Sequence, residues 1–361
     1  MSEVKEIMNM KKLNVTLAIL VAAVMAGNAQ VSTVPVGYVT HTVNARSDQR
    51  IGLPMQRGSV FTGAATTVNN ATVSASGITS LSGANFLVVT SGTAIGKWEE
   101  IQSSVTGSLT LTASIPGFVS GNSFEIKPFW TLGTLLPSGG GIPASPDPYD
   151  PVAFVLFYNP AATGINISSS KTYFYHNGSA DFAAGWYDND NVDQPQNDVV
   201  ISPEVGLTIR NGTASQISVP IVGTVPASQM ALDVVSRSSG PQDNILYNKF
   251  PTDVTLGNSG LVNLGNLLSS AVRPSSDAYD PGDQILMFRL GASGLNGSAS
   301  ASYFYFAGDA DFAAGWYDSS NPDGGLKNSV VIPAGAQVVI RKAAGTSGTV
   351  AWNPAVPYSV Q

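Results

Sequence analysis

The sequence predicts an all-β protein that contains a duplicated β-sandwich-like unit, a small antiparallel β-meander and little helix. Three observations predict this fold. The nonapeptide ADFAAGWYD occurs unchanged at residues 180–188 and 310–318. Short aromatic and β-branched runs are separated by Gly, Pro, Asn and Ser turns, as in strands and hairpins. After residue 30, no stretch has the sustained three- and four-residue apolar spacing of an amphipathic helix.

The first 29 residues have the pattern of a secretory signal peptide. Three lysines precede the apolar run LNVTLAILVAAVMA, residues 13–26, which ends in small residues, and we expect cleavage after Ala29. The run is shorter than the roughly 20 apolar residues of a membrane-spanning helix. We therefore expect a secreted protein, in the periplasm, on the cell surface or in the medium, with no transmembrane helix in the mature chain.

Residues 30–131 form the predicted N-terminal β region. VGYVTHTVN, residues 36–44, alternates apolar and polar residues, as a half-buried strand does. NFLVVTSG, GKWEEIQS, GSLTLTAS and NSFEIKPFW then follow as four strand-like runs separated by Gly and Ser turns. The spacing predicts an antiparallel meander over 85–130, inserted into this region.

The duplication extends well beyond the nonapeptide. Segment 172–188 matches 302–318 at an offset of 130 residues. Three more pairs align at similar offsets: 132–136 (LGTLL) with 264–268 (LGNLL), 147–151 (DPYDP) with 277–281 (DAYDP), and 199–210 with 330–341. Two copies of one fold with indels in loops would give this pattern. The predicted copies span 132–213 and 214–361, and the second copy has its matching core at 264–345.

Within each copy the apolar runs predict strands. These runs are AFVLFY (153–158) and QILMFRL (284–290), KTYFYH and ASYFYF, and VVI followed by LTIR or VVIR as two strands joined by a turn. We expect the nonapeptide to form one helical turn. Asp181 or Asp311 would cap this turn, and Gly185 or Gly315 would end it in a left-handed conformation.

Composition and charge exclude several classes of function. The chain has 17 Lys and Arg against 24 Asp and Glu, a net charge of −7, and no basic stripe. Nucleic acid and anionic membranes are therefore not expected partners. The chain has no cysteine, so disulfides do not contribute to its stability. The apolar content of 43% argues against disorder.

No motif for catalysis is present, and we expect a non-catalytic protein with no cofactor. After residue 30 the histidines are His41, expected exposed on a strand, and His176, expected at a strand end before a turn. This pair has no zinc-ligand spacing. There is no G-x-S-x-G nucleophile motif. The glutamates of the mature chain do not recur in both copies, as a duplicated carboxylate pair would.

Aspartates after the nonapeptide are the candidate metal ligands. They are Asp188, Asp190 and Asp193 in the first copy and Asp318 and Asp323 in the second. Oxygen-rich loops of this kind can bind calcium, although neither matches the EF-hand pattern. The alternative is that Asp and Asn form turns between two strands.

Aromatic residues of the nonapeptide are the candidate ligand-stacking residues: Trp186, Tyr187, Trp316 and Tyr317. If these rings are exposed, they could stack on sugar rings. The alternative is that they form the core of each copy, since large rings remove much apolar surface from water and both copies need the same packing.

Several segments together resemble an uncharacterised paralogous family of secreted proteins from the Verrucomicrobia group of bacteria. These segments are VGYVTHTVNARSDQRIGLPM, TSGTAIGKWEEI, SLTLT, SFEIKPFWTLGTLLP and the paired YFY and DFAAGWYD. The resemblance covers most of the mature chain. It implies export and a cell-envelope or extracellular setting, and it assigns no role to any residue.

The expected function is therefore that of a secreted structural or adhesin-like protein of the cell envelope or extracellular matrix. Its expected partners are polysaccharide or copies of itself. The alternatives are a carbohydrate-binding, lectin-like module and a calcium-dependent binding module. Two further alternatives are an outer-membrane β-barrel and a secreted hydrolase. The sequence has neither the regular strand pattern of a barrel nor the motifs of a hydrolase.

Overall fold

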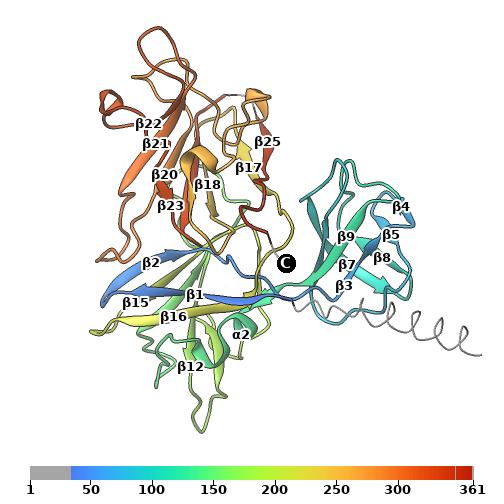
Figure 1. The fold of residues 1–361 in the computed structure, drawn as a ribbon. Coiled ribbons are helices and arrows are strands. Elements are labelled where there is room, and N and C mark those ends of the chain that lie inside the picture. Colours follow the sequence, from blue (N-terminus) through green and yellow to red (C-terminus); the bar gives the residue numbers. More distant parts are fainter. Residues whose placement is uncertain (1–33, 346, 360–361) are drawn as a thin grey trace, which may run out of the picture. The chain divides into compact units, whose positions relative to one another are not determined.

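The computed structural model describes residues 34–345 and 347–359, and Figure 1 shows its fold. The residues from Val36 onward form one compact unit. The predicted signal peptide, residues 1–29, lies outside the described residues. Across the described ranges the helical segments are short, which confirms the all-β prediction with little helix. These segments are α2 (Leu132–Leu135) and the 3-10 segments η1 (Pro137–Gly139), η2 (Leu256–Asn258), η3 (Leu267–Ser269) and η4 (Pro322–Gly324).

One part of the chain, called the first repeat, comprises residues 36–56 and 129–224. Its main sheet has five antiparallel strands in the order β13-β12-β11-β15-β2. Two smaller sheets pair β1 with β16 and β10 with β14. The strands are β1 (Val36–Val43), β2 (Ser47–Ile51), β10 (Trp130–Thr131), β11 (Ala153–Phe157), β12 (Lys171–His176), β13 (Gly185–Asp188), β14 (Val200–Ile201), β15 (Leu207–Asn211) and β16 (Ile217–Thr224).

Residues 231–352, called the second repeat, are built in the same way. The five-stranded sheet has the order β22-β21-β20-β24-β18, and smaller sheets pair β17 with β25 and β19 with β23. Each strand therefore has a counterpart at the equivalent place in the first repeat. The strands are β17 (Leu232–Ser236), β18 (Gln242–Tyr247), β19 (Val254–Thr255), β20 (Gln284–Met287), β21 (Ala301–Phe306), β22 (Gly315–Asp318), β23 (Val331–Ile332), β24 (Gln337–Lys342) and β25 (Gly348–Trp352).

This correspondence changes two details of the sequence alignment. β16 pairs with β1 over all eight residues, so the boundary expected at 213 and 214 moves to the linker after β16. The LGT triplet of α2 corresponds to η2 and not to the LGNLL segment at 264–268. The evidence is that Gly133 N donates to Asn197 O at 2.8 Å, and Gly257 N donates to Asn328 O at 2.9 Å.

Between β2 and β10 the chain forms a separate seven-stranded sheet, called the insertion, residues 57–128 (blue to cyan in Figure 1). Its strand order is β3-β9-β6-β7-β8-β5-β4, and it encloses its own apolar core. The predicted meander at 85–130 contains β6 to β9, but the sheet also includes three earlier strands, and β9 lies between β3 and β6. The strands are β3 (Phe61–Ala64), β4 (Thr67–Asn69), β5 (Thr72–Ser74), β6 (Asn85–Val89), β7 (Trp98–Val105), β8 (Ser108–Leu111) and β9 (Ser123–Pro128).

The nonapeptide forms no helical turn, which corrects the expectation for Asp181 and Asp311. Its last four residues are strands β13 and β22, and the residues before them are bends. Gly185 begins an edge strand and does not end a helix. A Cβ atom there would lie 3.0 Å from Pro195, so a side chain would force its neighbours to shift. The left-handed glycine lies earlier in the turn, at Gly178, φ +92°, and at Gly308, φ +91°.

Each repeat contributes a loop that docks on an Arg–Asp pair of the other repeat. In the first repeat Arg210 donates from Nε and Nη2 to the two carboxylate oxygens of Asp48, both at 2.8 Å. The loop between β20 and β21 binds this pair. Asn296 N donates to Asp48 at 2.8 Å, and its Oδ1 accepts from Arg210 Nη2 at 2.7 Å. Asp48 N also donates to Gly294 O at 3.0 Å.

The same set of hydrogen bonds recurs with the repeats exchanged. Arg341 donates to both carboxylate oxygens of Asp243, at 2.7 and 2.9 Å. Asn166 N, from the loop between β11 and β12, donates to Asp243 at 2.7 Å, and Asn166 Oδ1 accepts from Arg341 at 3.2 Å. Asp243 N donates to Gly164 O at 2.8 Å. We call these two sets the reciprocal interlock, because they place the repeats face to face as an isologous pair within one chain.

No helix in the described ranges is long and apolar enough to cross a membrane.

Candidate functional site

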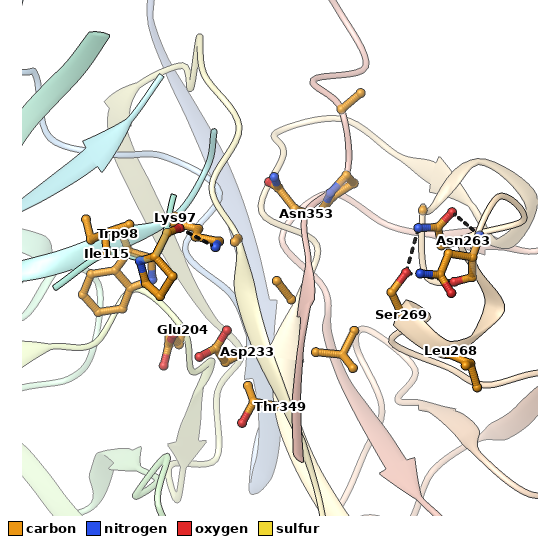
Figure 2. A pocket seen from close by; sticks show the side chains of 18 of the residues that line it. Lys97, Trp98, Ile115, Glu204, Asp233, Asn263, Leu268, Ser269, Thr349 and Asn353 are labelled. Carbon is orange, nitrogen blue, oxygen red and sulfur yellow. Dashed lines mark hydrogen bonds between the residues drawn. The ribbon is translucent and has the colours of Figure 1, made fainter. Parts of the chain in front are cut away.

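A groove lies between the insertion and the second repeat, shown in Figure 2. Its volume is about 1330 Å³. Two hydrogen bonds join the walls at one end: Asn353 Nδ2 donates to Ile95 O at 2.8 Å, and Ala231 N donates to Gly96 O at 2.7 Å. Residues that line the groove include Lys97, Trp98, Glu99, Glu204, Asp233, Asn263, Leu268 and Ser269.

Trp98 is the aromatic residue of the groove, and the insertion fixes its orientation. It begins β7, and its half-buried ring packs against Phe86 and Phe129 in edge-to-face geometry, with ring centroids 5.7 and 6.2 Å away. The indole also lies close enough to the side chain of Glu204 to favour its charged form. The two phenylalanine rings therefore fix the orientation of Trp98, which lines the groove.

Carboxylates from three different segments gather beside Trp98. Glu204 follows β14 and Asp233 lies in β17, and Figure 2 shows these two side chains next to each other. Burial, reinforced by the negative charge of Asp233, raises the pKa of Glu204 to about 7. Burial also raises the pKa of Asp233, and nearby Lys97 opposes this shift. The groove therefore holds a carboxyl group that takes up a proton near neutral pH.

A buried lysine lies behind this acidic wall. Lys249 is 5% exposed, and its Nζ has no hydrogen-bond partner among the described residues. Burial lowers its pKa to about 7, against the attraction of Glu204. Both members of this pair therefore shift toward their neutral forms, as expected when charges leave water.

The opposite wall, from the second repeat, carries amide and hydroxyl groups beside exposed apolar side chains. Asn263 Nδ2 donates to Ser269 Oγ at 2.9 Å, drawn as a dashed line in Figure 2. Leu264 and Leu268 are 74% and 85% exposed. The groove thus combines one aromatic ring, several hydrogen-bonding groups and an apolar margin, the usual composition of a ligand site.

The predicted calcium residues lie in turns and satisfy local donors. Asp188 is buried, pairs with Lys171 at 2.7 Å and accepts from Asp190 N at 3.0 Å. Asp193 N donates to Asn191 Oδ1 at 3.0 Å. These contacts support the alternative in which Asp and Asn form turns.

The second copy's candidates have the same kind of partners. Asp318 accepts from Ser320 N at 2.8 Å, and Asp323 accepts from Tyr279 Oη at 2.7 Å. Across the described residues, no group of three or more His, Asp or Glu side chains is placed to hold a metal ion.

The predicted ligand-stacking rings are buried. Trp186, Tyr187, Trp316 and Tyr317 are between 0% and 3% exposed. Trp186 Nε1 donates to Leu136 O at 3.1 Å, which anchors the ring in the core of the first repeat. With no exposed face these four rings cannot stack on a sugar, so their placement supports the core interpretation.

Both histidines are more buried than expected. His41 was expected on an exposed face but is 4% exposed, and burial lowers its pKa to about 4. It pairs with Val219 on β16, whose side lies against the first repeat's core. His176 does end β12, but it is fully buried, and its Nδ1 lies 2.8 Å from Ser145 O.

The residues of the groove were not found from the sequence. Trp98, Glu204, Asp233 and Asn263 come from four segments with no shared motif or spacing, and only the tertiary pairing brings them together. No sequence signal marked them as a group.

Comparisons of the chain with protein families, with curated proteins and with solved structures found no match.

Proposed function

We propose that this chain is a secreted, non-catalytic, adhesin-like protein of the cell envelope or extracellular matrix, and that the groove holds a hydroxyl-rich polysaccharide. The observation that carries the proposal is the juxtaposition of Trp98 with Glu99, Asp233 and Asn263 around a space of about 1330 Å³. Carboxylates accept hydrogen bonds from sugar hydroxyls, and side-chain amides both donate and accept them. An indole ring packs on the apolar face of a sugar.

The groove's acidic charge narrows the ligand class. Glu99 and Asp233 face Lys97 in a chain of net charge −7, so an acidic polysaccharide would meet repulsion there. A neutral polysaccharide pays no such cost. Its hydroxyl groups can use both the carboxylates of one wall and the amides of the other.

The test is affinity electrophoresis of the folded protein through gels that contain neutral glucans, xylans or mannans. We expect retardation by at least one of these, with a severalfold weaker effect for Asp233→Asn and for Asn263→Ala. Asp181→Asn is the matched control, because Asp181 is exposed and lies outside the groove. If the wild type migrates freely in every gel, or if the control weakens binding as much as Asp233→Asn, the proposal is wrong.

Glu204 supports a second candidate function, hydrolysis of a glycosidic bond. A carboxyl group with a pKa near 7 can donate a proton, and Asp233 beside it would be the second carboxylate. Release of reducing ends from the bound polysaccharide measures this activity. Loss of that release in Glu204→Gln, with binding retained, would establish catalysis, whereas binding without release supports the adhesin-like function.

A further inference from the structure

A second cavity lies at the reciprocal interlock, separate from the groove. It has a volume of about 980 Å³ and is lined by both five-stranded sheets and by the two docked loops. Its size falls in the range of small-ligand sites. Two arginines that line it, Arg210 and Arg341, are already neutralised by Asp48 and Asp243.

Arg50 breaks the balance of charge in this cavity. It lies on β2, two positions after Asp48 and therefore on the same face of the sheet. The equivalent position on β18 is Ile245, because Asp48 and Asp243 occupy the same register opposite their arginines. Arg50 therefore has no counterpart in the second repeat, although the residues around it do.

The guanidinium of Arg50 has no anionic partner among the described residues. Its central carbon lies 4.0 Å from the centroid of the Phe288 ring, a cation–π contact. A small adjoining pocket of about 60 Å³ adds Arg289, which is exposed and has no ion pair in the described ranges. The cavity and this pocket thus carry an excess of two positive charges in a protein of net charge −7.

The rest of the lining suits a polyhydroxylated ligand. Hydroxyl groups of Ser168, Ser298 and Ser300 and the amide of Asn296 line the cavity, together with the rings of Tyr158 and Phe288. A small inorganic anion needs no such surface. An acidic sugar would use the charge, the hydroxyl groups and the rings at once.

We propose that this cavity binds an acidic saccharide, whose carboxylate or sulfate group is held by Arg50. A planar guanidinium matches either oxyanion through paired N–H donors. The two sites of the chain would then select opposite partners: a neutral polysaccharide in the groove, and an acidic sugar between the repeats.

The test is isothermal titration of the full chain with three ligands of equal length: an oligogalacturonate, a sulfated oligosaccharide and a neutral oligosaccharide. We expect binding of at least one acidic ligand, weakened by added salt, whereas any binding of the neutral ligand, which the groove can accept, should not depend on Arg50. Arg50→Ile, which copies the second repeat, should lose at least tenfold in affinity. Which acidic ligand binds identifies the oxyanion as carboxylate or sulfate.

Arg57→Gln is the matched control, because Arg57 also lies over an aromatic ring, Trp130, at 5.9 Å, but does not line the cavity. Binding should be unchanged in this variant. If Arg50→Ile lowers the melting temperature but retains full affinity, Arg50 only joins the repeats and the proposal is wrong. Absence of binding for both acidic ligands would also overturn it. Asp233→Asn in the groove should leave this affinity unaltered, so failure of the groove proposal is distinguishable.

Discussion

The two repeats have the same strand order but satisfy the same buried position with different chemistry. In the second repeat Asp283 accepts from Arg273 N and Ala343 N, each at 2.9 Å, and pairs with Lys342 and Arg273. At the equivalent place the first repeat has Ala153, the first residue of β11, and Asn211 takes the place of the lysine.

The amide of Asn211 serves the first repeat without any charge. Its Nδ2 donates to three backbone carbonyls, including Asn44 O at 3.0 Å and Ser215 O at 2.8 Å. One backbone arrangement therefore accepts either a neutral amide or a buried ion network. The comparison shows that the strand order depends on the pairing of backbone groups and on the apolar core, not on which polar residue completes the end of the sheet.

The largest expected effect comes from breaking the charged side of this comparison. Burial alone would raise the pKa of Asp283, but the attraction of Lys342 outweighs burial and lowers this pKa. The carboxylate therefore stabilises the fold above pH 3.8 and loses this contribution in acid. Asp283→Asn leaves Lys342 buried without a counter-charge. We expect a loss of about 3–5 kcal/mol in the free energy of unfolding, measured by urea denaturation at pH 7.

The first repeat itself supplies the control for this change. The double variant Asp283→Ala with Lys342→Asn copies its residues Ala153 and Asn211. It should recover most of the stability lost in Asp283→Asn, because no buried charge remains unpaired. If the double variant is as unstable as the single one, the two repeats are not interchangeable at this position.

The reciprocal interlock gives the next prediction, which tests how symmetric the two repeats are. Asp48→Ala and Asp243→Ala each remove a bidentate arginine pair and the acceptor for a loop amide of the other repeat. We expect each to cost about 2 kcal/mol in thermal or urea unfolding, with the two values close to each other. A large loss for one and none for the other would show that the loops dock independently.

Lys249 sharpens the comparison in the opposite direction, since this buried lysine of the second repeat has no hydrogen-bond partner for its Nζ among the described residues. Between pH 7 and 10.5 the unfolded chain binds the lysine's proton and the folded chain does not, so stability should rise with pH across this window. Lys249→Met should flatten that rise and stabilise the protein at pH 7 by about 1–3 kcal/mol. Unfolding curves at pH 7 and pH 10 measure both effects. A destabilised variant would mean that the buried ammonium is needed for folding.

The smallest effect is expected for His176→Phe, which copies Phe306. Both side chains pack edge-to-face on a tyrosine, with ring centroids 6.0 and 6.2 Å away. The change removes the contact of Nδ1 with Ser145 O but also removes a buried Nε2 that has no hydrogen-bond partner among the described residues. We expect a difference below about 1 kcal/mol in either direction. A larger loss in the free energy of unfolding would show that the first repeat depends on its histidine.

The sequence was sufficient for the class of fold and for the strands richest in aromatic residues. KTYFYH and ASYFYF are β12 and β21 without a change of boundary, because a run of aromatic residues favours the pleated surface of a sheet. The expected helical turn at Asp181 failed because the chain there bends toward an edge strand. Local capping residues cannot reveal this tertiary constraint.

Long-range pairing explains the remaining differences. β1 pairs with a strand more than 170 residues later, so neither its partner nor the extent of the first repeat could be read locally. Trp98 and Glu204 are also far apart in the sequence, so the groove could not be predicted from it. The role of Arg50 could not be predicted either, because its lack of an anionic partner among the described residues follows from how the sheets pack.

The insertion leaves and re-enters the first repeat at a closed neck. Trp130 Nε1 donates to Met55 O at 3.1 Å, and Gln56 exchanges two backbone hydrogen bonds with Thr224, at 2.8 and 3.0 Å. The second repeat joins the equivalent strands, β18 and β19, by a short link. The insertion is thus joined to the first repeat at one place and has its own apolar core. Trp98 of the groove belongs to this insertion, whereas Asp233 and Asn263 belong to the second repeat.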